Sequence, residues 1–302
     1  MIIGLGCLAH DRVLVTEGTW QSGKGRILRS ESRIGGNART ALAAVASLGY
    51  PAAYLATVGT SPTGDLAMTD MRSHGIDTRF IERLAGADPV EATVTITSDG
   101  ERYIAFDDSS LASTPLPSDT TINSALAIAE ALIVDATTAP PGTTDVVKRA
   151  RSNGIPIILD AERVASPAVL TLLDEADHLV VPLGFGAQVT GRQDPKHIVS
   201  TLWNDNRVAI VLTDGAKGVF VSSHPSEVAH VPAFTIDAVD TTGCGDVFHG
   251  TYAWSLARGD SLPERVRIAS AAAAAVAELP TGARRVPTLE QITRLLAFGE
   301  TR

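Results

Sequence analysis

Asp240-Thr241-Thr242-Gly243-Cys244-Gly245-Asp246-Val247-Phe248-His249-Gly250 is the stretch of this chain that decides its fold. Its two inner glycines allow backbone amides to approach a ligand, and the apolar residues that follow predict a helix. The unpaired N–H groups and positive dipole of that helix N-terminus suit a phosphate, or the charge on a phosphoryl group during transfer. Asp246 lies in the first helical turn, where a carboxylate can accept a proton from an attacking hydroxyl. The alternative is that Asp246 only caps the helix.

Three further motifs carry polar groups that can bind a ligand. Gly35-Gly36 opens an alanine-rich helix at Asn37-Ala38-Arg39-Thr40, where backbone and the Asn37 amide can approach a polyhydroxylated ligand, although Asn37 alone is more simply a capping residue. Asp11 follows the first predicted strand, and ligands bind at the carboxyl ends of strands in open α/β sheets, although Asp11 could also be an ordinary surface residue. Thr213-Asp214-Gly215-Ala216-Lys217-Gly218 either lines a nucleotide edge or is only a hairpin turn.

Short apolar runs alternate with helical patterns along most of the chain, which favours a mostly parallel sheet with helices on both faces. Glycine just past the last periodic residue marks several of the helix ends. The predicted strands are Ile2–Leu5, Ala131–Asp135, Ile155–Asp160, His178–Val181 and Val208–Thr213. The predicted helices are Ala38–Leu48, Asp65–His74, Thr143–Asn153, Asp246–Arg258, Pro263–Glu278 and Leu289–Phe298.

Two segments break this alternation, at about 12–34 and 92–106. The second alternates apolar and polar residues on both sides of Asp99-Gly100, which is a strong hairpin signal. Both segments are too polar on one face to lie inside a two-sided parallel sheet, so we expect a small separate sheet that forms a lid. Since there is no repeat or long linker, residues 1–302 are predicted to form one α/β domain that carries this lid.

Composition narrows the class of protein. The 302 residues are 44% hydrophobic and 20% charged, which excludes global disorder. A formal net charge of −9 argues against nucleic-acid binding, which needs a basic face. Two isolated cysteines fit a reducing compartment rather than a disulfide framework. The N-terminus predicts a buried strand rather than a signal peptide, and no apolar run approaches the ~20 residues of a membrane span, so we expect a cytoplasmic protein.

In this order, the four motifs resemble those of the PfkB family of carbohydrate kinases, which has the ribokinase-like α/β fold. The 240–250 string matches the family's C-terminal signature, with Cys244 where alanine is usual, and the glycine pair is similar to the N-terminal signature of ketohexokinases. Within the family the chain is most similar to ketose kinases, including sulfofructose kinase, which shares the Asp11-Arg12 start, the Ser22-Gly23-Lys24 turn and the Asp-Val-Phe-His-Gly ending. The resemblance covers nearly the whole chain.

The resemblance implies an ATP-dependent sugar kinase, a phosphotransferase that acts on a primary hydroxyl of a ketose or related sugar. Asp246 would be the general base, and the backbone amides of Gly243, Cys244 and Gly245 would form an anion hole. The implied sugar ligands are Asp11, Gly35, Gly36, Asn37 and Thr40, and the implied ATP-site residues are Thr213, Gly215, Gly218 and Thr242. Magnesium would arrive with ATP. Some members also bind a monovalent cation such as potassium, and Asp240 and the Thr242 carbonyl match two of its ligand positions.

Positive charge near the glycine pair adds an expectation about the sugar. Lys24 and Arg39 fall on or near the lid and the glycine pair, where they could bind the phosphate, sulfonate or carboxylate of an anionic sugar. Arg39 lies in the first turn of a helix whose N-terminus repels cations, so it is less easily dismissed as surface charge. The alternative is solvated charge with no role in binding.

Two positions depart from the family's usual pattern. Asn-x-x-Glu usually follows the strand that ends here at Val181, where this chain has Pro182-Leu183-Gly184-Phe185-Gly186, and a second Asn is usual at Thr40. The first departure leaves open a catalytically weakened sugar- or nucleotide-binding protein, and a ribose or nucleoside kinase is the alternative within the class. Because the lids of such proteins often clasp a second lid, we expect a homodimer joined through the lids, with neither nucleic acid nor membrane as a partner.

Overall fold

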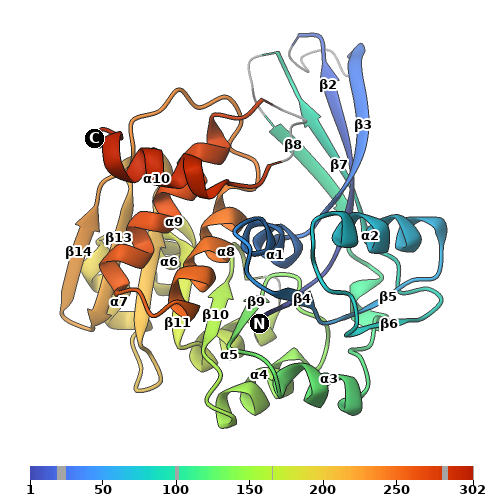
Figure 1. Cartoon of the computed structure of the whole chain (residues 1–302), viewed down its shortest axis with the longest axis horizontal. Helices are drawn as coiled ribbons and strands as arrows, with labels where there is room; N and C mark the ends of the chain where they lie inside the picture. Colours follow the sequence, from blue (N-terminus) through green and yellow to red (C-terminus); the bar gives the residue numbers. More distant parts are fainter. Residues whose placement is uncertain (19–24, 99–101, 165, 281–284, 302) are drawn as a thin grey trace.

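The computed structural model describes all of the chain except residues 19–24, 99–101, 165, 281–284 and 302. Its main sheet has eight strands: β1 (Ile2–Leu5), β4 (Ala52–Tyr54), β9 (Ala131–Asp135), β10 (Ile157–Asp160), β11 (His178–Pro182), β12 (Ala209–Thr213), β13 (Val219–His224) and β14 (Glu227–Val231). Their order is β14-β13-β12-β11-β10-β9-β1-β4 (Figure 1). The strands from β12 to β4 are parallel, whereas β13 and β14 form an antiparallel edge.

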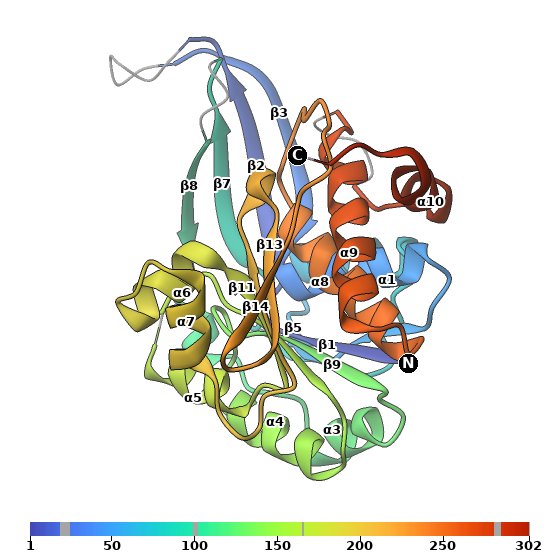
Figure 2. The ribbon, with the colours of Figure 1, turned by 90° about the vertical axis from the view of Figure 1, so that its left-hand side faces the viewer.

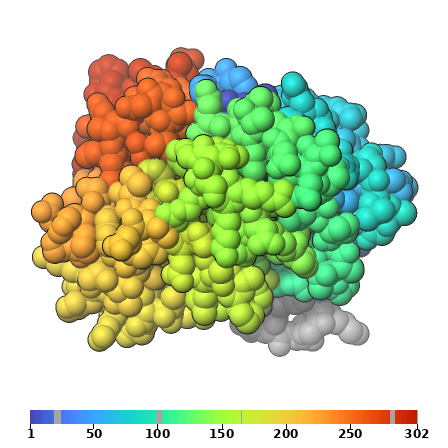
Figure 3. All heavy atoms as spheres, turned by 90° about the horizontal axis from the view of Figure 1, so that it is seen from below, coloured from blue at the N-terminus to red at the C-terminus, as the bar shows by residue number. Residues whose placement is uncertain are grey.

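Ten α-helices occur in the described residues, and most of them cover the two faces of this sheet. They are α1 (Asn37–Ser47), α2 (Pro62–Ser73), α3 (Asp119–Leu126), α4 (Thr143–Ser152), α5 (Pro167–Glu175), α6 (Leu183–Thr190), α7 (Pro195–Leu202), α8 (Cys244–Ala257), α9 (Leu262–Ala277) and α10 (Leu289–Phe298). α1, α8 and α9 pack on one face and α3 to α7 on the other (Figure 2). Figure 3 looks from below, where the green to yellow segments of that second layer occupy the centre.

Burial on both faces explains the sequence of the central strands. All five residues of β9 are buried, and so are the first four of β12, which reads Ala-Ile-Val-Leu-Thr. A strand covered on both sides has no solvent face on which to place polar residues, so its sequence is a continuous apolar run. An acid at the end of such a strand, such as Asp135 in β9, therefore lies at the carboxyl edge of the sheet.

A separate four-stranded sheet rises from the main body and forms the lid. Its strands are β2 (Ala9–Thr16), β3 (Ile27–Gly35), β7 (Val90–Ile96) and β8 (Arg102–Asp107), in the order β3-β2-β7-β8. Both ribbon views show it standing beyond the carboxyl ends of the main-sheet strands. A short parallel pair, β5 (Ala56–Val58) and β6 (Ile81–Arg83), and two 3₁₀ turns, Leu111–Ser113 and Gly215–Lys217, complete the described elements.

The predicted architecture is confirmed, with shifts at element ends. β1, β9 and α10 have their predicted bounds, and the other predicted strands are within two residues. β2 begins at Ala9, three residues before the predicted start of the lid. Asp11, which was expected just past the first strand and before the lid, therefore lies within a lid strand. β7 and β8 pair antiparallel as the predicted hairpin requires, although Asp99-Gly100 lies outside the described residues. No described helix is long and apolar enough to cross a bilayer.

Candidate active site

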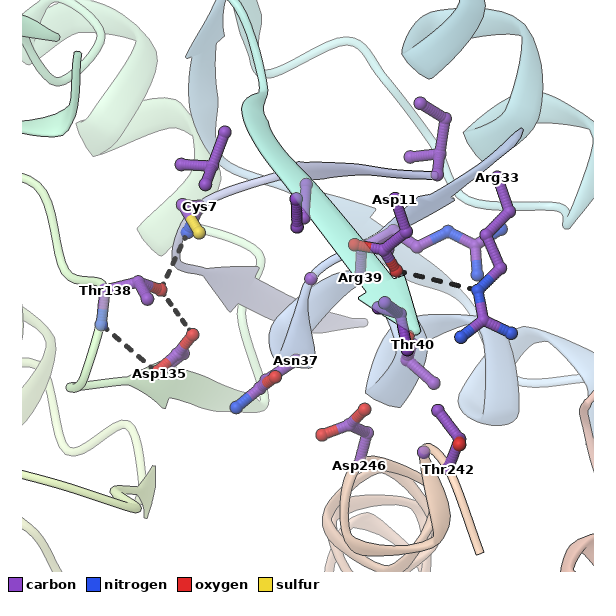
Figure 4. A pocket seen from close by; sticks show the side chains of 18 of the residues that line it. Cys7, Asp11, Arg33, Asn37, Arg39, Thr40, Asp135, Thr138, Thr242 and Asp246 are labelled. Atoms are coloured by element: carbon purple, nitrogen blue, oxygen red, sulfur yellow. Dashed lines mark hydrogen bonds and ion pairs between the residues drawn. The ribbon is translucent and has the colours of Figure 1, made fainter. Parts of the chain in front are cut away.

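A cleft of about 1120 Å³ lies between the lid and the carboxyl ends of the main-sheet strands. Figure 4 shows Asp11, Asn37, Thr40 and Asp246 around this space, although they come from the lid, α1 and α8. The predicted site residues that line the cleft are Asp11, Gly35, Gly36, Asn37, Arg39, Thr40, Thr242, Gly243, Gly245 and Asp246. Lys24, which was also predicted, lies outside the described residues.

Asp246 is the third residue of α8, and the N-cap of that helix is Gly243. Gly243 has a φ of 75°, a left-handed conformation that glycine adopts without the strain other residues incur. Among the described residues no side chain makes a capping hydrogen bond at this helix end, so the interpretation of Asp246 as a simple cap is wrong. Its carboxyl lies instead at the cleft, beside the positive end of the helix dipole.

The electrostatic surroundings make Asp246 a strong base. Its pKa is raised well above the usual carboxyl value, first because the group is withdrawn from bulk water and then because Asp160, Glu162 and Asp135 are negative neighbours. A carboxylate with a raised pKa accepts a proton more readily, which is how general bases are prepared for work near neutral pH. The arrangement therefore favours proton abstraction at this position.

Each position of the glycine pair requires glycine for a different steric reason. Gly36 has a φ of 110°, and a Cβ there would lie 2.4 Å from the backbone oxygen of Cys7. A Cβ at Gly35 would lie 2.6 Å from Oδ2 of Asp11, so the missing side chain leaves room for that carboxylate. Gly36 is also the N-cap of α1, and no side chain caps this helix, so the interpretation of Asn37 as a capping residue is wrong. Its Nδ2 donates instead to Oδ2 of Asp160, 3.1 Å away.

Asp11 lies on β2 directly opposite Arg33 on β3. The Arg33 Nε atom is 3.6 Å from Oδ2 of Asp11 (Figure 4). Burial raises the pKa of Asp11, and the charge of Arg33 opposes that rise. The lid thus places an ion pair on the cleft wall, and sequence analysis found only its acidic member.

Sequence analysis also missed two acids at the ends of main-sheet strands. Asp135 ends β9 and Asp160 ends β10, and they are neighbours across the parallel ladder. Asp135 is buried, and its carboxylate accepts from the backbone amides of Thr137 and Thr138, at 3.0 and 3.3 Å, and from the Thr138 hydroxyl. An acid that closes a buried apolar strand was the available signal, because such ends mark the ligand edge of open α/β sheets.

His249 connects α8 to this acidic edge. The ring is buried, and its nitrogens face two backbone oxygens, Nδ1 at 2.8 Å from Gly245 and Nε2 at 2.7 Å from Val180. Asp160 lies beside the same ring, with Oδ1 3.6 Å from Nε2. Asp160 in turn binds Asn37, so one chain of contacts links the first turn of α8 to the start of α1.

Arg39 is held by other residues of the cleft wall. Its side chain is 8% exposed, its Nε donates to Oδ2 of Asp70 at 2.8 Å, and its Nη2 contacts Asp70 and His74. The negative charge that Arg39 was predicted to seek in a sugar is thus already supplied by Asp70 on α2. This arrangement gives the guanidinium a role in joining α1 to α2.

We therefore predict that Arg39→Ala acts mainly on stability. Leaving Asp70 without its cation should lower the free energy of unfolding by about 2–3 kcal/mol, somewhat less than for a fully buried pair because Asp70 is partly exposed. Chemical denaturation measures this, with Arg79→Ala, in an exposed pair with Asp77, as the control that should change it by less than about 1 kcal/mol. A rise in KM confined to anionic sugars, at unchanged stability, would restore the substrate-binding interpretation.

The predicted ATP residues, apart from Thr242, do not line the cleft. Thr213 is the last residue of β12, at the same edge of the sheet as Asp135 and Asp160, and it is followed by the turn that begins at Gly215. Gly218 has a φ of 99°, and a Cβ there would lie 2.3 Å from the Val231 oxygen, so this glycine is required by the packing of β13 against β14. The hairpin turn is therefore present, and its use by a nucleotide stays a prediction.

The loop before α8 contacts an arginine that sequence analysis did not single out. The Asp240 carboxylate and the Thr242 carbonyl, predicted as ligands of a monovalent cation, both face the guanidinium of Arg285. Cys244 is the first residue of α8, and burial raises the pKa of its thiol, with Arg285 opposing. A thiol with a raised pKa is a weak nucleophile, because little of it is thiolate near neutral pH.

The pH dependence of stability gives a further prediction. Burial and the charge of Asp160 raise the pKa of Asp135 to about 7, above the unfolded value of about 4. The folded state therefore binds this proton more tightly, and stability is lost as the pH rises from about 4 through 7. Thermal unfolding should show a higher Tm at pH 5.5 than at pH 8, and Asp135→Asn should reduce that difference. An unchanged difference, equal to that of the exposed control Asp145→Asn, would contradict this assignment.

Comparison with known proteins shows the family of this chain. The family model described as pfkB family carbohydrate kinase matches residues 2–289. The chain belongs to this family. This pfkB-family chain is 26% identical over 273 residues to the ribokinase of Haemophilus influenzae, and the match covers 87% of each chain. It is 28% identical over 246 residues to fructokinase-2 of Oryza sativa, and that match covers 76% of this chain and 72% of the relative.

A solved structure supports the same fold for this pfkB-family chain. The Arabidopsis thaliana ribokinase complexed with ribose and ATP superposes with a TM-score of 0.86 at 22% identity, covering 98% of both chains. The fold is thus ribokinase-like, with a large mostly parallel sheet and a small separate sheet. As a family member, the protein is a phosphotransferase with a hydroxyl acceptor, that is, a carbohydrate kinase.

Proposed function

We propose that this kinase transfers the γ-phosphoryl group of ATP to a primary hydroxyl of a sugar held between the lid and α8, with Asp246 as the general base. The observation that carries the proposal is that Asp11, Asn37 and Asp246 meet in one cleft, with Asp246 at a glycine-rich helix N-terminus. A base, hydroxyl ligands and an anion-binding helix end in one space are the parts that phosphoryl transfer to a sugar needs.

Each part has a defined chemical task. Asp246 accepts the proton of the sugar hydroxyl while that oxygen bonds to the γ-phosphorus, and the bond from phosphorus to the bridging oxygen breaks to release ADP. The backbone amides of Gly243, Cys244 and Gly245 bind oxygens of the transferred group, helped by the positive end of α8. The proton leaves Asp246 to solvent after the product departs.

The charges of the cleft favour a neutral sugar. The arginines that line it in the described part of the chain each face a carboxylate: Arg33 faces Asp11, Arg39 faces Asp70, Arg163 faces Asp108 and Arg285 faces Asp240. Because these guanidinium groups already have carboxylate partners, they are poor ligands for the sulfonate or phosphate of an anionic sugar. A ketose remains the proposed class, and the ribokinase relatives make ribose or a nucleoside the within-class alternative.

Magnesium would fit the oxygen-rich edge of this cleft. The described residues contain no cluster of three or more potential ligands that would form a dedicated metal cage. Magnesium needs only one or two carboxylates when nucleotide phosphates and water complete its shell, and it would neutralise charge on the phosphates. Glu162 lines the cleft, so its carboxylate would hold the ion in place of the missing Asn-x-x-Glu.

A coupled ADP-release screen tests the proposed activity. Neutral ketoses, ribose, nucleosides and anionic sugars are compared with ATP and Mg²⁺, with ATP alone as the blank. A ketose should give the highest kcat/KM. Binding of ATP and sugar by calorimetry without turnover would support the weakened binding protein, and preference for ribose or a nucleoside would support the within-class alternative.

We also propose that two chains associate through their lids. Tyr103, Ile104 and Phe106 on β8 are 55%, 61% and 49% exposed, and Ile27 and Leu28 on β3 are 48% and 58% exposed. Apolar side chains exposed on a sheet that stands away from the main body are typical of an interface. A second lid would cover them and would help to exclude water from the cleft.

Ile96→Asp on β7 tests the association. Placing a carboxylate on the cleft side of the lid should convert a dimer to a monomer in light scattering at micromolar concentration, and should raise ATP hydrolysis relative to sugar phosphorylation. Leu170→Asp on α5, at an exposed leucine outside the lid, is the control and should leave both unchanged. A monomeric wild type would contradict the association while leaving the kinase proposal intact.

A further inference from the structure

Arg285 makes an unusually complete set of contacts beside the anion-hole loop. Its Nε donates to the Thr242 oxygen at 3.0 Å, and its Nη2 donates to the backbone oxygen of Asp240. Its Nη1 and Nη2 also donate to the oxygens of Leu279 and Val276, both at 3.1 Å. Nη1 is 3.4 Å from Oδ2 of Asp240, and the side chain is only 10% exposed.

Four of the donors of Arg285 make hydrogen bonds to backbone oxygens, and the guanidinium also forms an ion pair with the Asp240 carboxylate. A guanidinium carries five N–H groups, one on Nε and two on each Nη atom. The five oxygens it faces are four backbone carbonyls and one carboxylate, all of which only accept. The guanidinium is therefore held in one orientation rather than free to turn toward the cleft.

The five oxygens come from two parts of the fold that must stay together for the anion hole to keep its shape. Asp240 and Thr242 belong to the loop that leads into α8, whereas Val276 and Leu279 lie in and just after the last turn of α9. The carbonyls at a helix C-terminus have no intrahelical donor and carry the negative end of the dipole. The backbone amides of Val239 and Asp240 add bonds to the oxygen of Ala277.

This oxygen cage is also where the family resemblance puts a monovalent cation. Its predicted ligands, the Asp240 side chain and the Thr242 carbonyl, are both engaged by Arg285. A potassium ion in contact with them would have to displace a guanidinium that makes four hydrogen bonds and one ion pair with these oxygens. The residues present therefore do not fit a bound monovalent cation.

We propose that the guanidinium of Arg285 takes the place of a monovalent metal ion, so that the anion-hole loop is built without potassium. Arg285 supplies the same single positive charge as the ion. Its planar guanidinium also donates directional hydrogen bonds, which hold the loop and the end of α9 in one relative orientation. It is a positioning residue, because it contacts the Thr242 carbonyl and reaches the amides of Gly243 to Gly245 only through the loop. Of the three tests below, only the kinetic one depends on the proposed function.

Thallium(I) provides a structural test that does not depend on activity. Crystals of the wild type soaked in a thallous salt should show no anomalous peak within contact of Asp240 and Thr242. Crystals of Arg285→Ala, in which the five oxygens lose their donors, should show one. A peak at this place in the wild type would overturn the proposal, as would its absence in a variant whose loop keeps the wild-type conformation.

Thermal unfolding gives a second readout in solution. Replacing tetramethylammonium chloride by 100 mM potassium chloride should leave the Tm of the wild type unchanged and raise that of Arg285→Ala by about 3 °C, because a ligand stabilises the state that binds it. Arg267→Ala, an exposed arginine of α9 that donates to one carbonyl of α10, is the matched control and should respond as the wild type does. A potassium-dependent rise in the wild type would contradict the proposal.

Turnover in the two salts completes the test. Wild-type kcat should change less than about 2-fold between tetramethylammonium and potassium, whereas Arg285→Ala should lose about 10–100-fold and recover part of it with potassium in a saturable way. Arg285→Lys keeps the positive charge but loses the planar set of donors, and it serves as the test if the alanine variant does not fold. Its turnover should also be lower than that of the wild type. Several-fold loss of wild-type turnover without potassium, or full activity of the lysine variant, would overturn the proposal. Absence of all kinase activity would refute the proposed function and leave the thallium and thermal results to decide this one.

Discussion

Asp246→Asn should leave the fold and sugar binding intact and remove most turnover, with a loss of roughly 10²–10⁴-fold in kcat. The amide is close in size to the carboxyl, but it cannot accept the hydroxyl proton. Because Asp246 makes no capping hydrogen bond at α8, its replacement costs the helix no cap. The substitution also removes a carboxyl crowded by Asp160, Glu162 and Asp135, so the Tm at pH 8 should rise rather than fall.

Three measurements on this variant separate catalysis from structure. Calorimetry should show the sugar bound with nearly wild-type Kd, thermal unfolding should show the predicted rise in Tm, and steady-state kinetics should show the loss in kcat. Asp145→Asn on α4, an exposed carboxyl far from the cleft in the fold, should change none of them. Wild-type turnover in folded Asp246→Asn would mean that this carboxyl isn't the base.

Gly36→Ala should be among the most destabilising single substitutions in the chain. The new Cβ would meet the Cys7 backbone oxygen at 2.4 Å, and the residue would keep a φ of 110° that side chains rarely adopt. Neither backbone segment can shift easily, because Cys7 lies just after β1 and Gly36 is the N-cap of α1. We expect a loss of at least about 3 kcal/mol in the free energy of unfolding, from backbone strain together with overpacking.

Gly259→Ala is the control that separates these two causes. Gly259 also has a positive φ, 82°, but a Cβ there would meet nothing within 4 Å. Its substitution should cost only the strain of the left-handed conformation, about 1–2 kcal/mol. Equal losses for the two variants in chemical denaturation would show that the contact with Cys7 does not matter.

Local sequence signals predicted much of the fold, because the strands of the main sheet are apolar on both faces. β1 and β9 have the predicted bounds, and the C-terminal helices follow from their periodicity. The three-residue strands β4, β5 and β6 were missed, since so short a run has no period to detect. The start of the lid at Ala9 was missed for a different reason: β2 is fixed by its pairing with β3 and β7, which no local pattern records.

The candidate site was predicted only where a motif was continuous in sequence. Asp246 and Asn37 follow glycine-rich turns, so they could be singled out, whereas Arg285 reaches the site through tertiary contacts alone. Arg39 shows the opposite case: its place in the sequence indicated a free cation, and Asp70, 31 residues later, neutralises it. A partner on another helix cannot be identified from the residues around Arg39.

Phosphorus NMR of the wild type with ATP, Mg²⁺ and the preferred sugar is the most direct test of the central claim, that the cleft at Asp246 transfers a phosphoryl group to a sugar hydroxyl. ADP and one sugar phosphate monoester should appear in equal amounts, with the new ester at a primary carbon and with little inorganic phosphate. Release of ADP and inorganic phosphate alone, or no ADP with any sugar or nucleoside offered to the folded protein, would contradict it.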